Sequence, residues 1–174
     1  ICTFFMNALQ IKSKSVLQSW LGFFLALHDL GKFSEAFQSQ REDIFKDLRG
    51  RLPDPGKPYG VRHDTLGWMI WEGHLESIAI ENQWFGDDIE SATYGVAWWI
   101  RACFLMLRQP PRSAGAGHWR QHFSTHEDAP AIKTYIDELF ELFPPETLRA
   151  VPSSLGAERF ETVSQHLSWW IAGL

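Results

Sequence analysis

The amino-acid sequence predicts an all-α fold, arranged as one compact multi-helix domain over residues 1–174. Apolar residues recur at three- and four-residue steps along most of the chain, which is the spacing of a buried helix face. Segments in which β-branched and polar residues alternate are absent from the sequence, so nothing in it is typical of a β-strand. With 45% apolar and 21% charged residues, the chain is long enough to bury one substantial core.

The clearest helix of the sequence is almost wholly apolar, and His28 and Asp29 lie at its end. Its apolar residues cover nearly the whole circumference, so we expect it at the centre of the fold: Val16, Leu17, Trp20, Leu21, Phe23, Phe24, Leu25 and Leu27. Gly31 is a typical residue for ending such a helix. Ser34 is a typical N-cap, and it predicts a second helix that runs to about Leu48.

Later segments alternate between helices and loops that contain proline and glycine. Loops are expected at residues 51–60, which read RLPDPGKPYG, and at 109–125, which begin with Gln109-Pro110-Pro111. Helices are expected at about 63–78, 88–107, 127–143 and 157–172.

Composition excludes several classes of protein. The longest apolar run, from Trp20 to Leu27, is too short to cross a bilayer, and no secretion signal opens the chain. Two cysteines make no disulfide framework, which favours a cytoplasmic setting. The sequence contains neither a Walker-type phosphate loop nor a G-x-S-x-G nucleophile motif. The chain begins with Ile1 rather than Met, so we expect a domain truncated at one or both ends.

One basic segment stands out in an acidic chain. The formal net charge is −5, which argues against binding nucleic acid over the whole surface. From Arg101 to Arg120 there are four arginines and no acidic residue. Arg108, Arg112 and Arg120 are candidates for phosphate contacts, and Trp119 is a candidate for stacking on a base. The alternative is a solvated loop that is basic without binding anything.

The end of the apolar helix carries three polar side chains that could take part in catalysis or bind a metal ion: His28, Asp29 and Lys32. An imidazole and a carboxylate in apolar surroundings need compensation, and a bound metal ion supplies it, since both groups are good ligands for first-row metals. The alternative is that Asp29 caps or pairs with a nearby group and His28 is a satisfied core residue. His63, at the start of a later helix, is the next candidate ligand.

The remaining histidines are weaker candidates. His74 would lie about 16 Å along the same helix from His63, too far to share an ion, and is expected at the surface or the edge of the core. His118, His122 and His126 recur at steps of four, but nearby glycines and a helix-start pattern indicate that they do not share one helix. His166 is expected to be a core histidine.

Four places in the sequence carry a resemblance to a known family. The most specific is His28-Asp29-Leu30-Gly31-Lys32-Phe33 with Phe37-Gln38 following. Supporting places are Arg62-His63 after the proline-rich loop, the Gln109-Pro110-Pro111 turn, and residues 167–174 (LSWWIAGL). Together they resemble the HD superfamily of metal-dependent phosphohydrolases. More narrowly, they resemble the HD nuclease domain of the CRISPR type I effector nuclease-helicase.

The resemblance implies metal-dependent cleavage of single-stranded DNA in antiviral defence. It implies His28, Asp29 and His63 as metal ligands, with Asp29 placed to bridge two ions. It also implies a catalytic role for Asp29 and Lys32, where Lys32 neutralises a phosphate oxygen or holds Asp29. The implied cofactor is one or two divalent ions of manganese, cobalt, nickel or iron. The implied partners are single-stranded DNA, a helicase domain or subunit and an RNA-guided surveillance complex, with no membrane.

The chain departs from the family pattern at one internal place. The family carries tandem histidines before the Pro-Pro turn, where this sequence has Met106 and Leu107, and neither side chain replaces imidazole on such an ion. A partly degraded site with weak or absent metal binding is therefore expected. Two alternatives stay open: an inactive HD domain that serves as a binding or docking module, and an HD phosphohydrolase acting on nucleotides.

Overall fold

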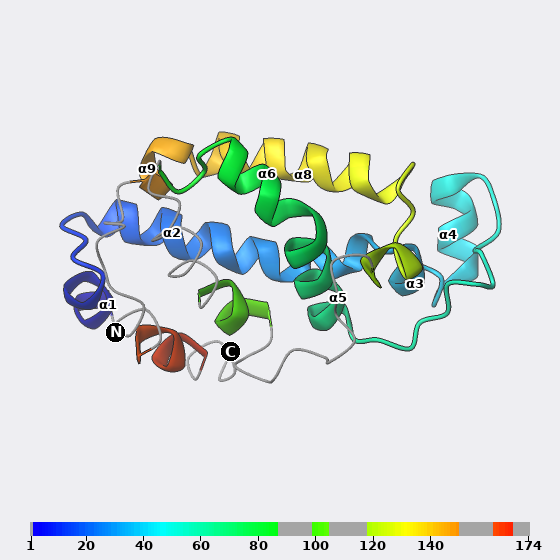
Figure 1. The fold of residues 1–174 in the computed structure, drawn as a ribbon, viewed down its shortest axis with the longest axis horizontal. Helices are drawn as coiled ribbons and strands as arrows, with labels where there is room; N and C mark the ends of the chain where they lie inside the picture. The colour runs from blue at the N-terminus through cyan, green and yellow to red at the C-terminus, as the bar shows by residue number, and fades with distance from the viewer. Residues whose placement is uncertain (1, 87–98, 105–117, 150–161, 169–174) are drawn as a thin grey trace.

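The computed structural model describes residues 2–86, 99–104, 118–149 and 162–168. Within these ranges the chain is helical with no strand, which confirms the predicted all-α fold. Two long helices, α2 (Lys14–Leu27) and α8 (Asp128–Leu142), run alongside each other (Figure 1). The hydroxyl of Tyr135 on α8 donates to the carbonyl oxygen of Ala26 on α2, at 2.9 Å.

Helix α2 is the centre of the core, as its sequence predicts. Its buried residues are Leu17, Trp20, Phe23, Phe24 and Leu27. Aromatic rings from distant segments surround it: the Trp20 ring lies 5.9 Å from those of both Phe85 and Trp99, measured between centroids. Burial of such large side chains is the main contribution to stability, at roughly 25 cal/mol for each Å² of apolar surface removed from water.

Shorter helices surround α2. They are α1 (Cys2–Ala8), α3 (Glu35–Gln38), α4 (Glu42–Arg49), α5 (His63–Ile70), α6 (Glu76–Glu81) and α9 (Pro145–Arg149). A 3₁₀ helix, η1 (His28–Phe33), follows α2 directly, and a second one, η3, spans His118–Gln121. A π-helical turn, η2 (Trp71–Leu75), joins α5 to α6, so the helix expected over 63–78 continues to Glu81. Residues 99–104 and 162–168 are also helical, whereas the rest of the helices expected at 88–107 and 157–172 lies outside the described residues.

Two expectations from the sequence are wrong. The single helix expected from Ser34 to Leu48 is divided between α3 and α4, because the side chains of Ser39 and Gln40 donate to the carbonyls of Ala36 and Phe37 and end the first helix.

The sequence predicts His166 in the core, and this prediction is wrong, because the side chain is exposed. Its helix buries Val163, Ser164, Leu167 and Ser168, which leaves residue 166 on the opposite face. The imidazole there packs against the ring of Phe4, with centroids 4.9 Å apart.

Helix α5 and the 3₁₀ helix η1 pack backbone against backbone. A Cβ atom added at Gly31 would lie 1.7 Å from the carbonyl oxygen of His63 and 2.7 Å from the amide nitrogen of Gly67. At Gly67, an added Cβ would lie 2.5 Å from the ring of Phe104. Two glycines therefore permit an approach that any side chain would prevent.

A buried ion-pair network holds the following segment, α3, to the start of α8. Arg49 pairs with Asp128 at 2.6 Å and with Glu127 at 2.9 Å. Arg51 pairs with Glu35 at 2.7 Å and also binds Glu127. Asp128 is fully buried and also accepts hydrogen bonds from the backbone N–H groups of Glu35 and Ser124, so the network satisfies the charges that it buries.

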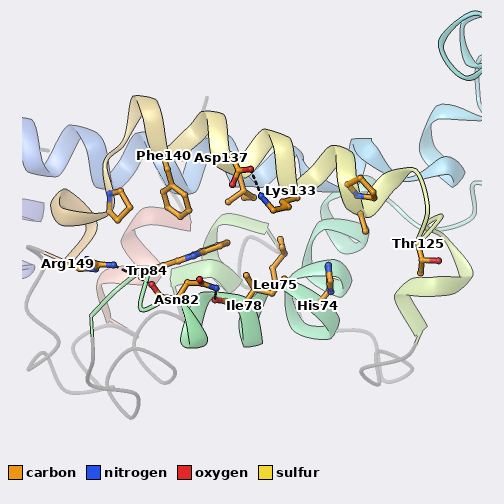
Figure 2. A pocket seen from close by; sticks show the side chains of 14 residues that line it. His74, Leu75, Ile78, Asn82, Trp84, Thr125, Lys133, Asp137, Phe140 and Arg149 are labelled. Atoms are coloured by element: carbon orange, nitrogen blue, oxygen red, sulfur yellow. Dashed lines mark hydrogen bonds and ion pairs between the residues drawn. The ribbon is translucent and has the colours of Figure 1, made fainter.

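A groove of about 670 Å³ separates α6 from α8. Its walls are mainly apolar, with Leu75, Ile78, Trp84 and Phe140 among the lining residues, and the ion pair Lys133–Asp137 lies on the α8 side (Figure 2). His74 lines it as well and is partly exposed, at the edge of the core. Among the described residues, no helix combines the length and the apolar character that crossing a bilayer requires.

We predict that Gly31→Ala destabilises the fold strongly. The added methyl group would meet the backbone of α5, which cannot move aside as a flexible side chain could. The expected loss is about 3 kcal/mol in the free energy of unfolding, measured by urea denaturation. Gly60→Ala is the matched control, since nothing lies within 4 Å of a Cβ at that position. Equal stabilities for the two variants would contradict the close contact.

We also predict an acid-sensitive contribution from Glu127. The hydrogen bond from Arg51 lowers the pKa of this carboxyl group to about 2. A carboxylate with a lowered pKa stabilises the fold above its unfolded pKa of about 4.5, and this stabilisation disappears as the pH falls towards 2. Glu127→Gln should therefore lower Tm near pH 6 and have little effect near pH 2. Glu141→Gln, at an exposed position of α8, is the control, and a Tm difference for Glu127→Gln that stays constant with pH would contradict the assignment.

Candidate metal centre

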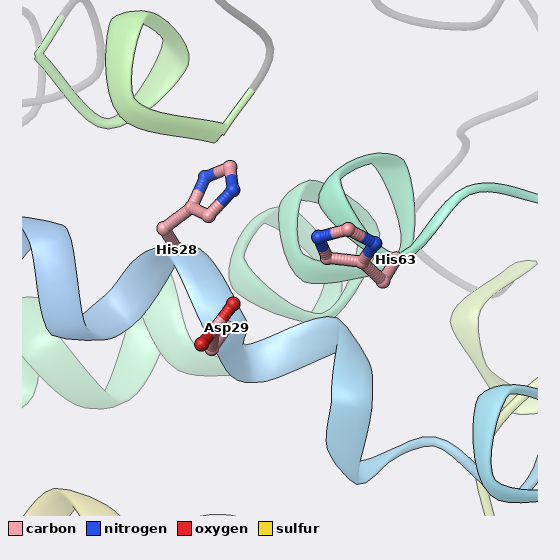
Figure 3. A group of neighbouring side chains, drawn as sticks. All are labelled: His28, Asp29 and His63. Atoms are coloured by element: carbon pink, nitrogen blue, oxygen red, sulfur yellow. The ribbon is translucent and has the colours of Figure 1, made fainter. Parts of the chain in front are cut away.

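Three predicted ligands lie together where α2 ends and α5 begins. His28 and Asp29 are the first two residues of η1, and His63 is the first residue of α5. One potential ligand atom from each residue lies within 4.8 Å of the other two (Figure 3). No second group of three such side chains is found within the described ranges.

The close contact at Gly31 places these side chains. Gly31 is buried against the carbonyl oxygen of His63, so the turn that carries His28 and Asp29 lies directly beside the first turn of α5. Residues adjacent in a 3₁₀ helix project about 120° apart, so His28 and Asp29 diverge around η1. His63 faces them from the neighbouring helix, and the three side chains border one common space (Figure 3).

The imidazole of His28 is oriented by the backbone of a third segment. Its Nδ1 lies 2.7 Å from the carbonyl oxygen of Cys103, and a carbonyl can only accept, so Nδ1–H is the donor. With Nδ1 engaged in this hydrogen bond, Nε2 is the ring nitrogen left for a metal ion. The same ring stacks on Phe104, with centroids 6.4 Å apart. His28 is thus a satisfied side chain and also an oriented candidate ligand.

Burial favours the ligating form of His63. Desolvation lowers its pKa, against the opposing effect of the neighbouring Asp64 carboxylate. A lowered pKa keeps the imidazole neutral at pH 7, and only the neutral ring binds a metal ion. Its ring centroid lies 5.7 Å from that of His28.

Asp29 forms the ion pair that the sequence left open as an alternative. Its Oδ1 lies 2.8 Å from Nζ of Lys32, and both side chains are about half exposed. Exposed pairs of this kind contribute about 0–1 kcal/mol to stability, so the pair alone does not explain why a carboxylate is placed beside two histidines.

The donor set fits one divalent transition-metal ion. Two nitrogen donors and one carboxylate oxygen suit ions such as manganese, cobalt, nickel and iron. Ligand atoms about 2.1 Å from an ion are separated by at most about 4.2 Å, so separations up to 4.8 Å require only small side-chain rotations. The sequence left open whether one ion or two ions that share Asp29 would bind. The three side chains lie close enough together for one ion, which would then have the three protein ligands that are usual at a catalytic site.

The structure describes only part of the basic segment from residue 101 to residue 120. Arg108, Arg112, Met106 and Leu107 lie outside the described residues. Arg120 is exposed, with its guanidinium group 4.8 Å from the centre of the Trp119 ring.

Trp119 does not fit the stacking role that the sequence indicated. The side chain is buried, with 2% of its surface exposed, and its ring stacks on that of His74 with centroids 5.2 Å apart. The 3₁₀ helix η3 packs against α5, and this contact buries the Trp119 ring in the interior. The three histidines spaced at four do not share a helix: His118 lies in η3, and His122 and His126 lie after its end.

The sequence interpretation missed the groups that orient the ligands. The carbonyl of Cys103 carries no signal in the sequence, because any residue supplies a carbonyl oxygen. Gly67 differs, since its spacing of four from His63 could have indicated a close approach to another helix. Phe37 is part of the sequence motif but was not predicted to lie at the site. Its ring lies beside that of His63, with centroids 5.7 Å apart.

The sequence of the chain matches the model of a known protein family. The model described as "Cas3, HD domain" matches residues 3–174, nearly the whole chain. Neither the curated proteins nor the solved structures contain a significant match. The family comprises HD-type nuclease domains of CRISPR defence, and its members depend on metal ions. On the strength of a match that includes every candidate ligand, the chain belongs to the Cas3 HD-domain family.

Proposed function

We propose that this protein is a nuclease that uses a divalent metal ion to cleave single-stranded DNA at His28, Asp29 and His63. The convergence of these three ligand atoms within 4.8 Å is the observation that supports it most strongly. Family membership supports the reaction class, and the match over residues 3–174 supports one HD-type domain.

The candidate ligands have different roles in the proposed metal centre. His28 and His63 would hold the ion through neutral imidazole nitrogens, and Asp29 would add negative charge that matches a divalent cation. An ion held there supplies Lewis acidity, which makes water a better nucleophile and offsets the charge that develops on the phosphate. Manganese, cobalt, nickel and iron all suit this donor set.

Lys32 is the proposed second catalytic residue. Its ammonium group lies 2.8 Å from Asp29 and remains half exposed, so it can hold the carboxylate and face a phosphate oxygen of the substrate. Asp29 keeps its second oxygen for the ion, since a carboxylate offers two acceptor atoms.

Binding of the strand requires positive charge in an acidic chain. Lys32 and Arg62 flank the candidate ligands, with 44% and 67% of their side chains exposed. Arg120 is an exposed cation from the basic segment, and Arg108 and Arg112 are proposed to continue this phosphate-binding surface. A helicase domain or subunit and an RNA-guided complex are the proposed partners, in line with the family.

A second ion would be bound more weakly. The family pattern has tandem histidines where this chain has Met106 and Leu107, whose side chains are poor ligands for these ions. We therefore propose one ion held by three protein ligands and a second position that is weak or lost.

We predict that Asp29→Asn abolishes metal-dependent cleavage. The substitution removes the charge that matches the ion and keeps the shape of the side chain. Cleavage of a single-stranded oligodeoxynucleotide, assayed with Mn²⁺, Co²⁺, Ni²⁺ or Fe²⁺, should fall at least about a thousandfold, and Tm should stay close to that of the parent. Asp137→Asn is the matched control, because Asp137 is also an exposed carboxylate paired with a lysine, on α8.

Three outcomes would contradict this proposal. Full activity of Asp29→Asn would remove the catalytic role of the centre. Failure of the parent protein to cut DNA with any of the four ions would indicate a docking module. Hydrolysis of nucleotides without cleavage of single-stranded DNA would indicate a nucleotide phosphohydrolase.

A further inference from the structure

Phe37 and Tyr59 form an aromatic wall that reaches the candidate metal centre at His63. The Phe37 ring lies 5.7 Å from the His63 ring and 5.6 Å from the Tyr59 ring, measured between centroids. Both contacts are edge-to-face, with interplanar angles of 69° and 82°. Phe37 and Tyr59 are partly exposed, so aromatic surface is open to solvent beside a predicted ligand.

The hydrophobic core does not account for Phe37. The core cluster and the partly buried side chains that pack on it include Tyr59 and the nearby Phe33, but not Phe37. Phe37 instead contacts the ring of Tyr59 and the ring of the candidate ligand His63. A large apolar side chain that is kept out of the core and next to a reactive centre is well placed to contact a ligand.

Hydrogen bonds fix the position of both aromatic residues. The backbone N–H of Phe37 donates to Oγ of Ser34 at 3.1 Å, and that hydroxyl donates to the carbonyl of Gly31 at 2.7 Å. Phe37 is thereby tied to the same turn that carries Asp29. The loop of Tyr59 is anchored by Lys57, whose ammonium group donates to the carbonyl of Arg120 at 2.9 Å. A platform held in this way loses little entropy when it binds a planar group.

The charges around this wall suit a nucleotide. Lys32 pairs with Asp29 and Arg62 pairs with Asp64, and both cations remain exposed enough to meet phosphate oxygens as well. An aromatic surface next to cations and next to a phosphate-cleaving centre matches a nucleoside phosphate, whose base and phosphate are separated only by the sugar. Aromatic stacking accepts every base, because each has a π-face.

We propose that Phe37 and Tyr59 form a base-stacking subsite that holds the nucleobase next to the phosphate to be cut. The inference rests on the proposed nuclease function and adds to it a reason for single-strand specificity. Bases within a duplex are already stacked on their neighbours and cannot reach this wall without being turned out of the helix. The subsite is therefore a specificity determinant, and the metal ligands alone would not distinguish single strands from duplexes.

The test compares two strands with equal charge in binding to the protein. One is a short oligodeoxythymidine, and the other has the same length with abasic sites in place of the bases. Binding is measured by fluorescence anisotropy in EDTA, so that neither strand is cut and the result does not depend on catalysis. The parent protein should bind the strand with bases about tenfold or more tightly, in line with the effect of losing one stacked base.

Substitutions test which side chains cause the preference for strands with bases. Phe37→Leu and Tyr59→Leu should each weaken binding of oligodeoxythymidine about fivefold or more and leave binding of the abasic strand unchanged. Tyr59→Phe keeps the ring and should behave as the parent. Phe33→Leu is the matched control, since its partly buried ring contacts Tyr135 instead, and it should keep the preference for bases.

The outcomes separate this inference from the function on which it rests. Equal binding of the two strands by the parent, no measurable binding of either, or an equal loss for both strands in Phe37→Leu would each overturn the subsite. DNA cleavage by the parent protein in the presence of metal would still support the nuclease proposal in those cases. Base-dependent binding without any cleavage would support the subsite and contradict the nuclease.

Discussion

The contact between Gly31 and the first turn of α5 is the constraint on which the candidate site depends. Without a Cβ at position 31, the backbone of η1 lies against the carbonyl of His63, and Gly67 allows Phe104 to pack close behind. The distance between packed helices depends on the side chains at their contact. A side chain at position 31 would push α5 away, so His63 would lie farther from His28 and Asp29 and the three ligands would not converge.

Two kinds of packing hold this contact in place. On one side, the core around α2 and the helical residues 99–104 bring the Cys103 carbonyl to His28. On the other side, the ion-pair network of Arg49 and Arg51 fixes α3 against α8 and stabilises the segment that follows η1. Removing one partner of the network would leave a buried charge without compensation, so the network disfavours other arrangements of these segments. Rigid support from both sides is what a preorganised metal centre requires.

The sequence predicted the all-α fold, the central helix and the three candidate ligands, because each has a local pattern: helical spacing around Trp20 and the His28-Asp29 motif. The sequence interpretation failed at other places. Ser39 and Gln40 end a helix early through local side-chain hydrogen bonds, which the spacing of apolar residues does not reveal. Trp119 packs inward against His74, a tertiary contact that no local pattern encodes. His166 was expected in the core because of its apolar neighbours, whereas the orientation of its helix exposes it. The grouping of all three ligands at one point also depends on how η1 and α5 pack, which local spacing does not encode.

The metal content of the protein tests the central claim most directly. The protein is incubated with manganese, cobalt, nickel or iron, desalted, and analysed by elemental analysis beside His28→Ala and His63→Ala variants whose folding is checked by Tm. The account predicts about one equivalent of at least one metal in the parent and less than about a tenth of that in each variant, because each loses one of three ligands. No stoichiometric metal in the parent, or full retention in both variants, would contradict a metal centre at His28, Asp29 and His63.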